Sequence, residues 1–485
     1  MALQYTCVDP AAFLYPDVTE YPGGTDRMTI LSPRNSYACG QILVYNVQAD
    51  TLSVEADGWH PEIYQMVAIP VERNEGMNEN NTRPHQPERV APFEVFDCLK
   101  PVRDGKVRVK NGVCALYFSE RIEKDAPAEV RNASVRIGDT VVPVTVTTAK
   151  AVVPDETLTV IMGYYNGFFR QFHHAEPGSD EFKRLDDLYL KTLRRSHQNM
   201  LYCPGPEVKK EENGEWTVSF SNMERYFTRM TAYGFRRFNW GLGFRRSWSA
   251  SEILVFGMPS MSLDCYCLLA KMLPALESFL REHGWLDMFT LGISDEPNEC
   301  NATEYRALCG MVRKLAPSLV LLDAMSYGPV HGAVDIWIPL NSEYQRHREE
   351  FEVYRKNGDV MWYYDCCGPR GNGYINRFMD YPLLATRYHF WASYLYRLPG
   401  YLHWAAVCYQ PGQNPFLQSC PEHHNADSVG FLPPGDTHLL YPGEGEPWMS
   451  VRLENQRASA EEYEMLEALA KKDKRLADEI CRSVC

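Results

Sequence analysis

Hydrophobic and polar residues alternate with a period of two through much of the first 155 residues, in runs such as QILVYNV, TLSVEA and TVVPVTVTT. Proline, glycine, asparagine and aspartate interrupt these runs. Successive side chains of a strand point to opposite faces, so the alternation predicts strands that bury one face. Many short strands separated by turn residues are typical of two packed sheets, and we therefore expect an all-β sandwich over residues 1–155.

A different pattern begins near residue 180. Amphipathic helical runs such as SNMERYFTRMTAYGF alternate with short apolar runs such as MFTLGIS, LVLLDA and VDIWIPL. This alternation predicts parallel strands joined by crossover helices, and about seven candidate strands approach the number in a (β/α)8 barrel. We expect a linker at 156–180 and a TIM-like α/β barrel at 181–485, closed by a C-terminal helix that begins near Ala460. A doubly wound sheet is the alternative.

Composition agrees with two globular domains and narrows the range of partners. The chain has 485 residues, of which 45% are hydrophobic, so it is long enough to bury more than one core. Its formal net charge of -14 repels nucleic acids and anionic membranes, and no apolar run is long enough to span a bilayer. We therefore expect neither a nucleic acid nor a membrane as a partner.

Cysteine usage bears on location and on metal binding. The 15 cysteines follow no framework spacing, and the first residues lack a secretory signal pattern, which together favour reduced thiols and a cytoplasmic location. An exported parent with a trimmed signal is the alternative. Neither the adjacent Cys366 and Cys367 nor CPEHH at 420–424 has a second ligand pair at a zinc-like spacing, so we expect no metal and no other cofactor.

Two carboxylates, Asp295 and Glu296, follow the apolar run MFTLGIS, and Pro297 ends that strand. The active site of a barrel lies at the C-terminal ends of its strands, where this pair would stand. Like charges held in a cleft resist ionising together, which is useful for acid and base chemistry. The same residues also suit an ordinary helix N-terminus, with Asp295 as the cap and Glu296 in the first turn.

Polar or aromatic residues accompany other predicted strands, and sugars bind such groups by hydrogen bonding and stacking. Trp404 would form a floor under a sugar ring. Tyr363 and Tyr364 point in opposite directions on one strand, so at most one of them faces the site, and we favour Tyr364. His197 suits a core position as well as a sugar contact. The predicted substrate-binding residues are His197, Asn199, Trp240, Asn341, Glu343, Tyr363, Tyr364, His403 and Trp404.

Several separated segments together resemble glycoside hydrolase family 123 and its wider relatives. They include GWLDMFTLGISDEP at 284–297, MWYYDCCGPRG at 361–371, GYLHWA at 400–405 and LLYPGEGEPWMSVRLENQRASAEEYEML at 439–466. The resemblance implies a β-sandwich followed by a barrel. It also implies a retaining β-N-acetylgalactosaminidase that uses an adjacent Asp–Glu pair, and this pair maps onto Asp295 and Glu296.

The resemblance implies a substrate-assisted reaction, in which the sugar's own 2-acetamido oxygen attacks C1. Glu296 would then be the general acid and base, and Asp295 would hold the acetamido N–H and stabilise the developing positive charge. We expect Asp295 to be the ionised partner, whose charge keeps Glu296 a proton donor. Tyr364 would donate a hydrogen bond to the acetamido oxygen.

The sequence therefore predicts a retaining, exo-acting β-N-acetylgalactosaminidase that hydrolyses terminal β-GalNAc of a glycan or glycoconjugate through an oxazoline intermediate. One alternative keeps the fold and the carboxylates but changes the β-glycoside, to β-GlcNAc or to a sugar without an acetamido group. Another alternative is a non-catalytic carbohydrate-binding protein, which the presence of Glu296 beside Asp295 disfavours.

Overall fold

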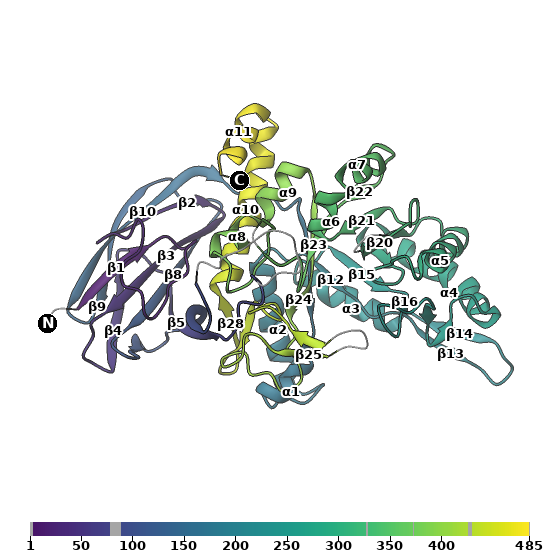
Figure 1. The fold of residues 1–485 in the computed structure, drawn as a ribbon, viewed down its shortest axis with the longest axis horizontal. Helices are drawn as coiled ribbons and strands as arrows, with labels where there is room; N and C mark the ends of the chain where they lie inside the picture. Colours follow the sequence, from purple (N-terminus) through teal and green to yellow (C-terminus); the bar gives the residue numbers. More distant parts are fainter. Residues whose placement is uncertain (1–2, 78–88, 326–327, 372, 425–428, 485) are drawn as a thin grey trace.

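The computed structural model describes residues 3–77, 89–325, 328–371, 373–424 and 429–484. Two β-sheets form the N-terminal region, at the left of Figure 1. The larger sheet contains, in spatial order, β1 (Gln4–Val8), β3 (Ser36–Tyr45), β8 (Cys114–Ile122), β5 (Glu62–Val71), β6 (Phe93–Pro101), β28 (Pro447–Ser450) and β27 (Leu440–Pro442). The smaller sheet contains β2 (Met28–Arg34), β10 (Thr140–Val152), β9 (Val130–Ile137), β4 (Thr51–Asp57) and β7 (Lys106–Arg108).

One hydrophobic core draws residues from both of these sheets. β10 buries Val142, Val144 and Val146 and leaves the residues between them more accessible, as the period-two pattern predicted. Ile42 of β3 and Phe118 of β8 join the same core from the larger sheet. Burial of alternate apolar side chains stabilises this region, by about 1.5–3 kcal/mol for each large side chain that leaves water.

A nine-stranded sheet, whose strand pairings are parallel, organises the rest of the chain. Its spatial order is β22 (Val360–Met361), β21 (Ile336–Pro339), β20 (Val320–Met325), β19 (Phe289–Gly292), β15 (Arg237–Gly241), β12 (Met200–Tyr202), β11 (Thr159–Tyr164), β24 (Gly400–Val407) and β23 (Tyr363–Asp365). Leu340, next to β21, forms a parallel bridge with Tyr364 of β23. Because this bridge links β21, the second strand of the order, to β23 at the other end, the sheet is nearly closed and barrel-like.

Helices connect most of the successive strands of this sheet (Figure 1). They are α2 (Asp180–Arg195), α3 (Ser221–Ala232), α4 (Leu263–Glu282), α5 (Ala302–Leu315), α6 (Asn341–Arg346), α7 (Arg348–Lys356), α8 (Leu383–Arg387) and α9 (His389–Tyr396). Serine caps begin two of the longest: Ser179 accepts a hydrogen bond from the backbone N–H of Phe182, and Ser262 accepts one from that of Cys265. These side chains satisfy N–H groups that a helix start leaves without a partner.

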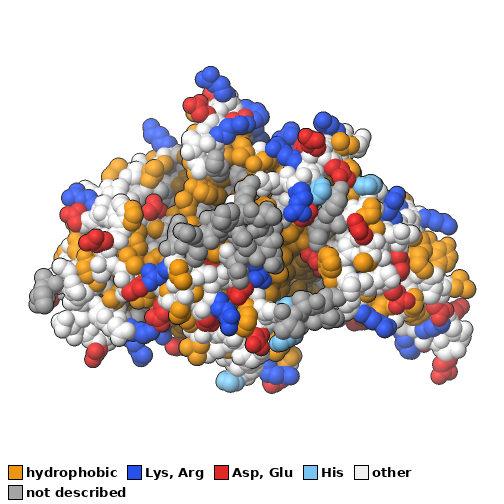
Figure 2. All heavy atoms as spheres, in the orientation of Figure 1, with side chains coloured by type: hydrophobic (Ala, Val, Ile, Leu, Met, Phe, Trp, Pro, Cys, Tyr) orange, Lys and Arg blue, Asp and Glu red, His pale blue; other side chains and the backbone are white. Residues whose placement is uncertain are grey.

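Short elements extend the connections between strands and helices. They are η1 (Asn166–Phe168), α1 (Phe169–Phe172), β13 (Glu207–Lys210), β14 (Trp216–Ser219), β16 (Gly243–Phe244), β17 (Leu254–Val255), β18 (Met258–Pro259), η2 (Leu286–Met288), β25 (Glu422–His424) and β26 (Val429–Phe431). On the face shown in Figure 2, acidic and basic side chains are interspersed. Among the described residues, no helix combines the length and the apolar character needed to cross a bilayer.

The parallel sheet begins earlier in the chain than the sequence predicted. β11 lies within residues 156–180, the predicted linker, yet it pairs with both β12 and β24. Its residues 159–163 are all buried, so it lacks the alternation by which a half-buried strand is recognised. β27 and β28 also depart from the prediction, because they extend the N-terminal sheet although their sequence lies in the predicted barrel segment.

The helix α10 (Val451–Ala470) lies between the N-terminal sheets and the parallel sheet in Figure 1, and α11 (Lys474–Val484) follows it. α10 begins before Ala460, the predicted start. Its buried residues include Arg452, whose Nε and Nη2 atoms each lie 3.0 Å from a carboxylate oxygen of Asp97 in β6. Charged residues normally indicate an exposed face, and for this reason the sequence pattern concealed the burial of α10.

Candidate active site

A cavity of about 520 Å³ opens at the C-terminal ends of the parallel strands. Residues at or just after the ends of β12, β15, β19, β20 and β23 line it, together with Trp404 of β24. Its lining includes the aromatic residues Tyr165, Tyr202, Tyr364 and Trp404 and the carboxylates Asp295, Glu296 and Asp323. The volume falls within the range of small-molecule sites, and the mixture of rings and carboxyl groups suits a polar ligand with apolar faces.

Asp295 and Glu296 lie side by side in the turn that follows β19, and both line the cavity. Glu296 adopts a left-handed backbone conformation with φ of 49°, which is unusual for a residue other than glycine. Arg245 holds this turn, because its Nη2 atom lies 2.9 Å from the carbonyl oxygen of Asp295 and 2.8 Å from that of Glu296. The Glu296 N–H also donates to the carbonyl oxygen of Ala324. The turn is therefore held from two sides in a geometry that presents both carboxyl groups.

The electrostatics of the pair differ from the sequence expectation. Asp295 is exposed to the cavity, yet the protein around it desolvates its carboxyl group and raises the pKa to about 7. The negative charges of Glu296 and Asp323 act in the same direction, and Arg245 acts against them. We expected Asp295 to be the ionised partner, whereas desolvation and the neighbouring negative charges favour its protonated form up to about neutral pH.

Tyr364 faces the cavity, and Tyr363 does not. The Tyr364 hydroxyl donates to Oε1 of Glu296 at 2.5 Å, whereas the Tyr363 hydroxyl donates to the carbonyl oxygen of His389 at 2.8 Å. The two neighbours thus point to opposite sides of β23, as the strand geometry predicted. The hydrogen-bond partner of Tyr364 in the structure is the carboxyl group of Glu296.

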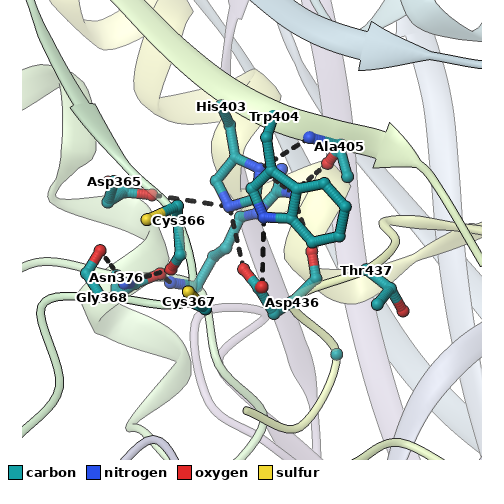
Figure 3. Close-up of polar contacts among 12 residues, drawn as sticks. Asp365, Cys366, Cys367, Gly368, Asn376, His403, Trp404, Ala405, Asp436 and Thr437 are labelled. Atoms are coloured by element: carbon teal, nitrogen blue, oxygen red, sulfur yellow. Dashed lines mark hydrogen bonds and ion pairs between the residues drawn. The ribbon is translucent and has the colours of Figure 1, made fainter. Parts of the chain in front are cut away.

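Trp404 lines the cavity, and its indole nitrogen contacts the carboxyl group of Asp436 (Figure 3). Its Nε1 atom donates to Oδ2 of Asp436 at 3.1 Å. Burial raises the pKa of Asp436 to about 7, although the charge of Arg377 opposes this shift. His403 is fully buried beside the same carboxyl group, with Nε2 at 3.2 Å from Oδ1 of Asp436.

His403 is therefore not a substrate-binding residue, contrary to the prediction. Its Nδ1 atom accepts hydrogen bonds from the Ala405 N–H and from Nη2 of Arg377, at 3.0 and 2.6 Å. These donors leave the ring proton on Nε2, the atom that lies near Oδ1 of Asp436. Burial, and after it the charge of Arg377, lowers the pKa of His403, so the ring is neutral. Because β24 extends to Val407, His403 lies within the strand and points away from the cavity.

His197 and Asn199 lie at the opposite end of the parallel strands from the cavity. His197 precedes β12 and contacts Glu156 at 2.8 Å and Glu461 at 3.3 Å. Burial alone would lower its pKa, but the hydrogen bonds to these carboxylates raise the pKa to about 9. The Asn199 side chain binds the backbone of Val160 and Leu158 at 3.0 and 2.7 Å. Both predictions are wrong, because residues before a strand stand at its N-terminal end.

Trp240 does not line the cavity; its neighbour on the strand, Asn239, does. The Trp240 ring packs behind the strand, against Gly205 and Phe256. Successive residues of a strand point to opposite faces, so an error of one residue reverses the assignment.

Asn341 and Glu343 lie in the first turn of α6, outside the cavity. The Asn341 amide donates to the carbonyl oxygen of Ile375 at 2.8 Å, and Glu343 pairs with Arg346 at 2.8 Å. Asn341 and Tyr363 instead line a separate cavity of about 350 Å³. The chain turns into a helix immediately after β21, and this turn carries both polar residues away from the mouth of the sheet.

Asp323 and Arg245 belong to the site but were not predicted. Oδ2 of Asp323 accepts hydrogen bonds from the Tyr305 hydroxyl at 2.6 Å and from the backbone N–H groups of Ile293 and Ser294 at 2.8 and 3.1 Å. Despite these bonds, burial raises the pKa of Asp323 to about 6. An acidic residue near the end of the apolar run LVLLDA was the available signal. Arg245 lies in a loop and gave no comparable signal.

No three His, Cys, Asp or Glu side chains converge on a point that could hold a metal ion, as far as the described residues go. The cavity instead combines a pair of adjacent carboxyl groups, a phenol that binds one of them, and an indole ring at the wall. Such groups can transfer a proton, stabilise a positive charge and stack against a sugar ring.

Comparison with known proteins bears on the same region. Residues 189–469, more than half of the chain, match the family described as glycoside hydrolase 123, catalytic domain, which confirms the resemblance in the sequence. No curated protein sequence matches the chain.

Solved structures give a likeness of fold. The chain is similar to a family 123 glycoside hydrolase from Clostridium perfringens, studied for glycolipid glycan hydrolysis, with a TM-score of 0.77 and 12% identity, over 100% of this chain and 91% of that one. It is also similar to a β-galactosidase from the psychrophilic Marinomonas ef1, with a TM-score of 0.39 and 10% identity, over 67% of this chain and 62% of that one. The first likeness extends over the N-terminal sheets as well as the parallel sheet.

Proposed function

Because the chain belongs to glycoside hydrolase family 123, we propose that it is a retaining, exo-acting β-N-acetylgalactosaminidase that hydrolyses terminal β-GalNAc. The observation that carries the proposal is the position of Asp295 and Glu296 side by side on one cavity. Most glycosidases place two carboxylates on opposite sides of the scissile bond, which adjacent residues do not readily do. An adjacent pair suits a reaction in which the substrate supplies the nucleophile.

In the first step, the acetamido oxygen of the sugar attacks C1 while Glu296 protonates the leaving oxygen. Oε1 of Glu296 accepts a hydrogen bond from the Tyr364 hydroxyl, so Oε2 is the oxygen that carries the proton. Asp295 accepts the acetamido N–H and stabilises the positive charge of the oxazoline ring. In the second step, ionised Glu296 takes a proton from the water that opens the ring. Two inversions at C1 give net retention.

The raised pKa of Asp295 fits a site that develops positive charge only during the reaction. Desolvation disfavours the carboxylate and raises the pKa of Asp295 to about 7. Asp295 enters the step as a carboxylate that has released its proton to solvent, and the positively charged oxazoline beside it then stabilises the ionised form. The electrostatic stabilisation is then larger in the transition state than in the ground state, which is the condition for accelerating the chemical step.

Trp404 supplies the platform for the sugar ring. Its indole ring borders the cavity, and the hydrogen bond to the buried carboxyl group of Asp436 sets the orientation of the ring (Figure 3). The apolar face of a hexose packs well against such a surface, which orients C1 toward the carboxylates.

We also propose that the nearly closed sheet is a (β/α)8 barrel, preceded by a β-sandwich over about residues 1–155. Trp362 alone separates β22 from β23, so the nine strands occupy eight positions around the sheet. The core that draws residues from both N-terminal sheets supports the sandwich.

The test is a panel of aryl β-glycosides that carry the same leaving group. We expect β-GalNAc to be hydrolysed more than about a hundredfold faster than β-Gal, because only the former contains the intramolecular nucleophile. β-GlcNAc in the same panel tests the configuration at C4. A thiazoline analogue of the oxazoline should inhibit competitively. Equal rates on β-GalNAc and β-Gal would contradict substrate assistance and favour a glycosidase of another β-glycoside.

A further inference from the structure

Two polar side-chain atoms on the cavity lining have no protein partner among the described residues. One is Nδ2 of Asn239, whose other amide atom, Oδ1, accepts a hydrogen bond from the Thr290 hydroxyl at 2.9 Å. In this orientation of the amide, Oδ1 faces the Thr290 hydroxyl and the NH2 group faces away from it. The NH2 group of Asn239 is thereby directed at the cavity as a hydrogen-bond donor.

The second atom is Oδ1 of Asp323. The other carboxylate oxygen, Oδ2, accepts hydrogen bonds from Tyr305 and from the backbone at Ile293 and Ser294. Three donors on one oxygen hold the carboxyl group in place, and Asp323 is only 6% exposed. Oδ1 is left on the cavity side as a hydrogen-bond acceptor.

Gly292 stands between these two atoms. A Cβ atom added at this residue would lie 3.2 Å from Oδ1 of Asp323 and 3.5 Å from Nδ2 of Asn239. The glycine does not have a positive φ, so the backbone does not require it. Its effect is to leave open the space that faces both polar atoms.

We propose that Asn239 and Asp323, on either side of Gly292, form a clamp that binds one hydroxyl group of the terminal sugar and so selects which sugar the cavity accepts. The inference rests on the proposed function for the presence of a sugar in this cavity. A hydroxyl group both accepts and donates, so it can accept from Asn239 and donate to Asp323 at the same time. Both protein groups lose their partner when the hydroxyl is missing, and this makes such a site selective.

An acetamido group also contains a donor and an acceptor, but at separate atoms. Exchanging the donor at Asn239 and the acceptor at Asp323 distinguishes a hydroxyl ligand from an acetamido ligand. In Asp323→Asn, the three donors around Oδ2 require the amide oxygen there, so the NH2 group takes the place of Oδ1. In Asn239→Asp, the Thr290 hydroxyl keeps its acceptor, and the group that faces the cavity becomes an acceptor.

Each single variant should lower kcat/KM on the parent aryl β-GalNAc by about 10²–10⁴-fold, because the hydroxyl proton loses its acceptor in Asp323→Asn and one of two acceptors is left without a donor in Asn239→Asp. The double variant Asn239→Asp/Asp323→Asn restores one donor and one acceptor in exchanged positions. A hydroxyl group can rotate to use them, so we expect recovery of at least about tenfold over either single variant. An acetamido group cannot exchange its atoms, and absence of recovery would overturn the assignment to a hydroxyl.

A set of 3-, 4- and 6-deoxy aryl β-GalNAc substrates identifies the hydroxyl group. One member should be a poor substrate for the wild type, by about 10²-fold or more, and this penalty should shrink below about tenfold in the single variants.

Gly292→Ala, which fills the space between the two atoms, should lower activity on the parent substrate. Glu343→Gln makes the same chemical change outside the cavity and should leave every rate unaltered.

The result that overturns the clamp is a wild type that uses all three deoxy substrates within about threefold of the parent, or a deoxy penalty that persists in every variant. If Asp323→Asn does not fold, Asn239→Asp and Gly292→Ala on the same substrates decide the question. Failure of the proposed function appears elsewhere, as equal rates on β-GalNAc and β-Gal. In that case, deoxy analogues of the preferred glycoside test the clamp independently.

Discussion

The hydroxyl group of Tyr364 donates a 2.5 Å hydrogen bond to Oε1 of Glu296. Tyr364 comes from β23, an end of the sheet order, and Glu296 follows β19, which lies within it. The two side chains meet across the cavity because the sheet nearly closes on itself. Glu296 is thereby oriented with one oxygen engaged and the other available for proton transfer.

Replacing Tyr364 by phenylalanine removes this hydrogen bond at a small cost in volume. We expect Tyr364→Phe to lower kcat on a poorly activated aryl β-GalNAc by about 10–10²-fold, because a less well oriented acid transfers its proton less efficiently. Tyr363→Phe is the matched control, since the Tyr363 hydroxyl binds the backbone of His389 away from the cavity. Equal losses in the two variants would contradict the orienting role of Tyr364.

Glu296→Gln keeps the shape of the side chain and removes its acidity. Activity on a natural disaccharide should fall by about 10²–10⁴-fold, the usual effect of losing a positioned proton donor. A substrate with a very good leaving group needs no protonation, so its first step should be spared. Pre-steady-state measurement of leaving-group release from the two substrates separates these cases. Near wild-type turnover of the disaccharide would refute the assignment.

Asp295→Asn should slow formation of the oxazoline even with a good leaving group, because the developing positive charge loses its partner. This behaviour differs from that of Glu296→Gln, in which the good leaving group escapes the defect. Burst kinetics with an activated aryl β-GalNAc compare the two variants directly. An unimpaired burst in Asp295→Asn would indicate a structural role for this carboxyl group.

The pH dependence of the wild type follows from the raised pKa of Asp295. If the first step needs ionised Asp295, kcat/KM on an aryl β-GalNAc with a very good leaving group, which needs no proton from Glu296, should rise with pH through about 7. The same limb should be absent from Asp295→Asn, measured across the same buffers. A wild-type profile that is already flat below pH 6 would show that ionisation of Asp295 does not limit the reaction.

Ionisation of Asp295, which we expect to raise activity, should lower the stability of the folded protein. The pKa of Asp295 is raised from 3.8 to about 7 in the folded protein, so the folded state holds the proton more tightly than the unfolded chain. Ionisation of Asp295 therefore opposes folding as the pH rises through this interval. Thermal unfolding should show a higher Tm for Asp295→Asn than for the wild type at a pH of about 8, and a smaller difference at about 4.

The ion pair between Asp97 and Arg452 joins the N-terminal sheet to α10, and both side chains are fully buried. Asp97→Asn should destabilise the protein by about 3–5 kcal/mol, because the guanidinium then stays buried without its counter-charge. Denaturant unfolding measures the loss. Lys183→Ala breaks an exposed pair with Asp180 and should cost less than about 1 kcal/mol. Similar losses in the two variants would contradict the importance of the buried pair.

Much of the architecture and the centre of the site were accessible from the sequence. Period-two alternation identified strands such as β10, and strand–helix alternation identified the parallel sheet. The adjacency of Asp295 and Glu296 is covalent, so a single strand end brings both to the same place. The opposite directions of Tyr363 and Tyr364 likewise follow from the geometry of one strand. Each of these inferences depends on residues that are close in the chain.

Tertiary structure decided the features that depend on residues far apart in the chain. Trp240 and His403 were misplaced because which face or end of a strand borders the cavity depends on the register and extent of its neighbours. Asp323 and Arg245 act on the turn at Asp295 from other segments. Arg452 is buried because Asp97, which lies in a distant segment of the sequence, supplies its counter-charge. Local periodicity records whether a side chain prefers water, but the partner that lets a charged group leave water is set only when the chain folds.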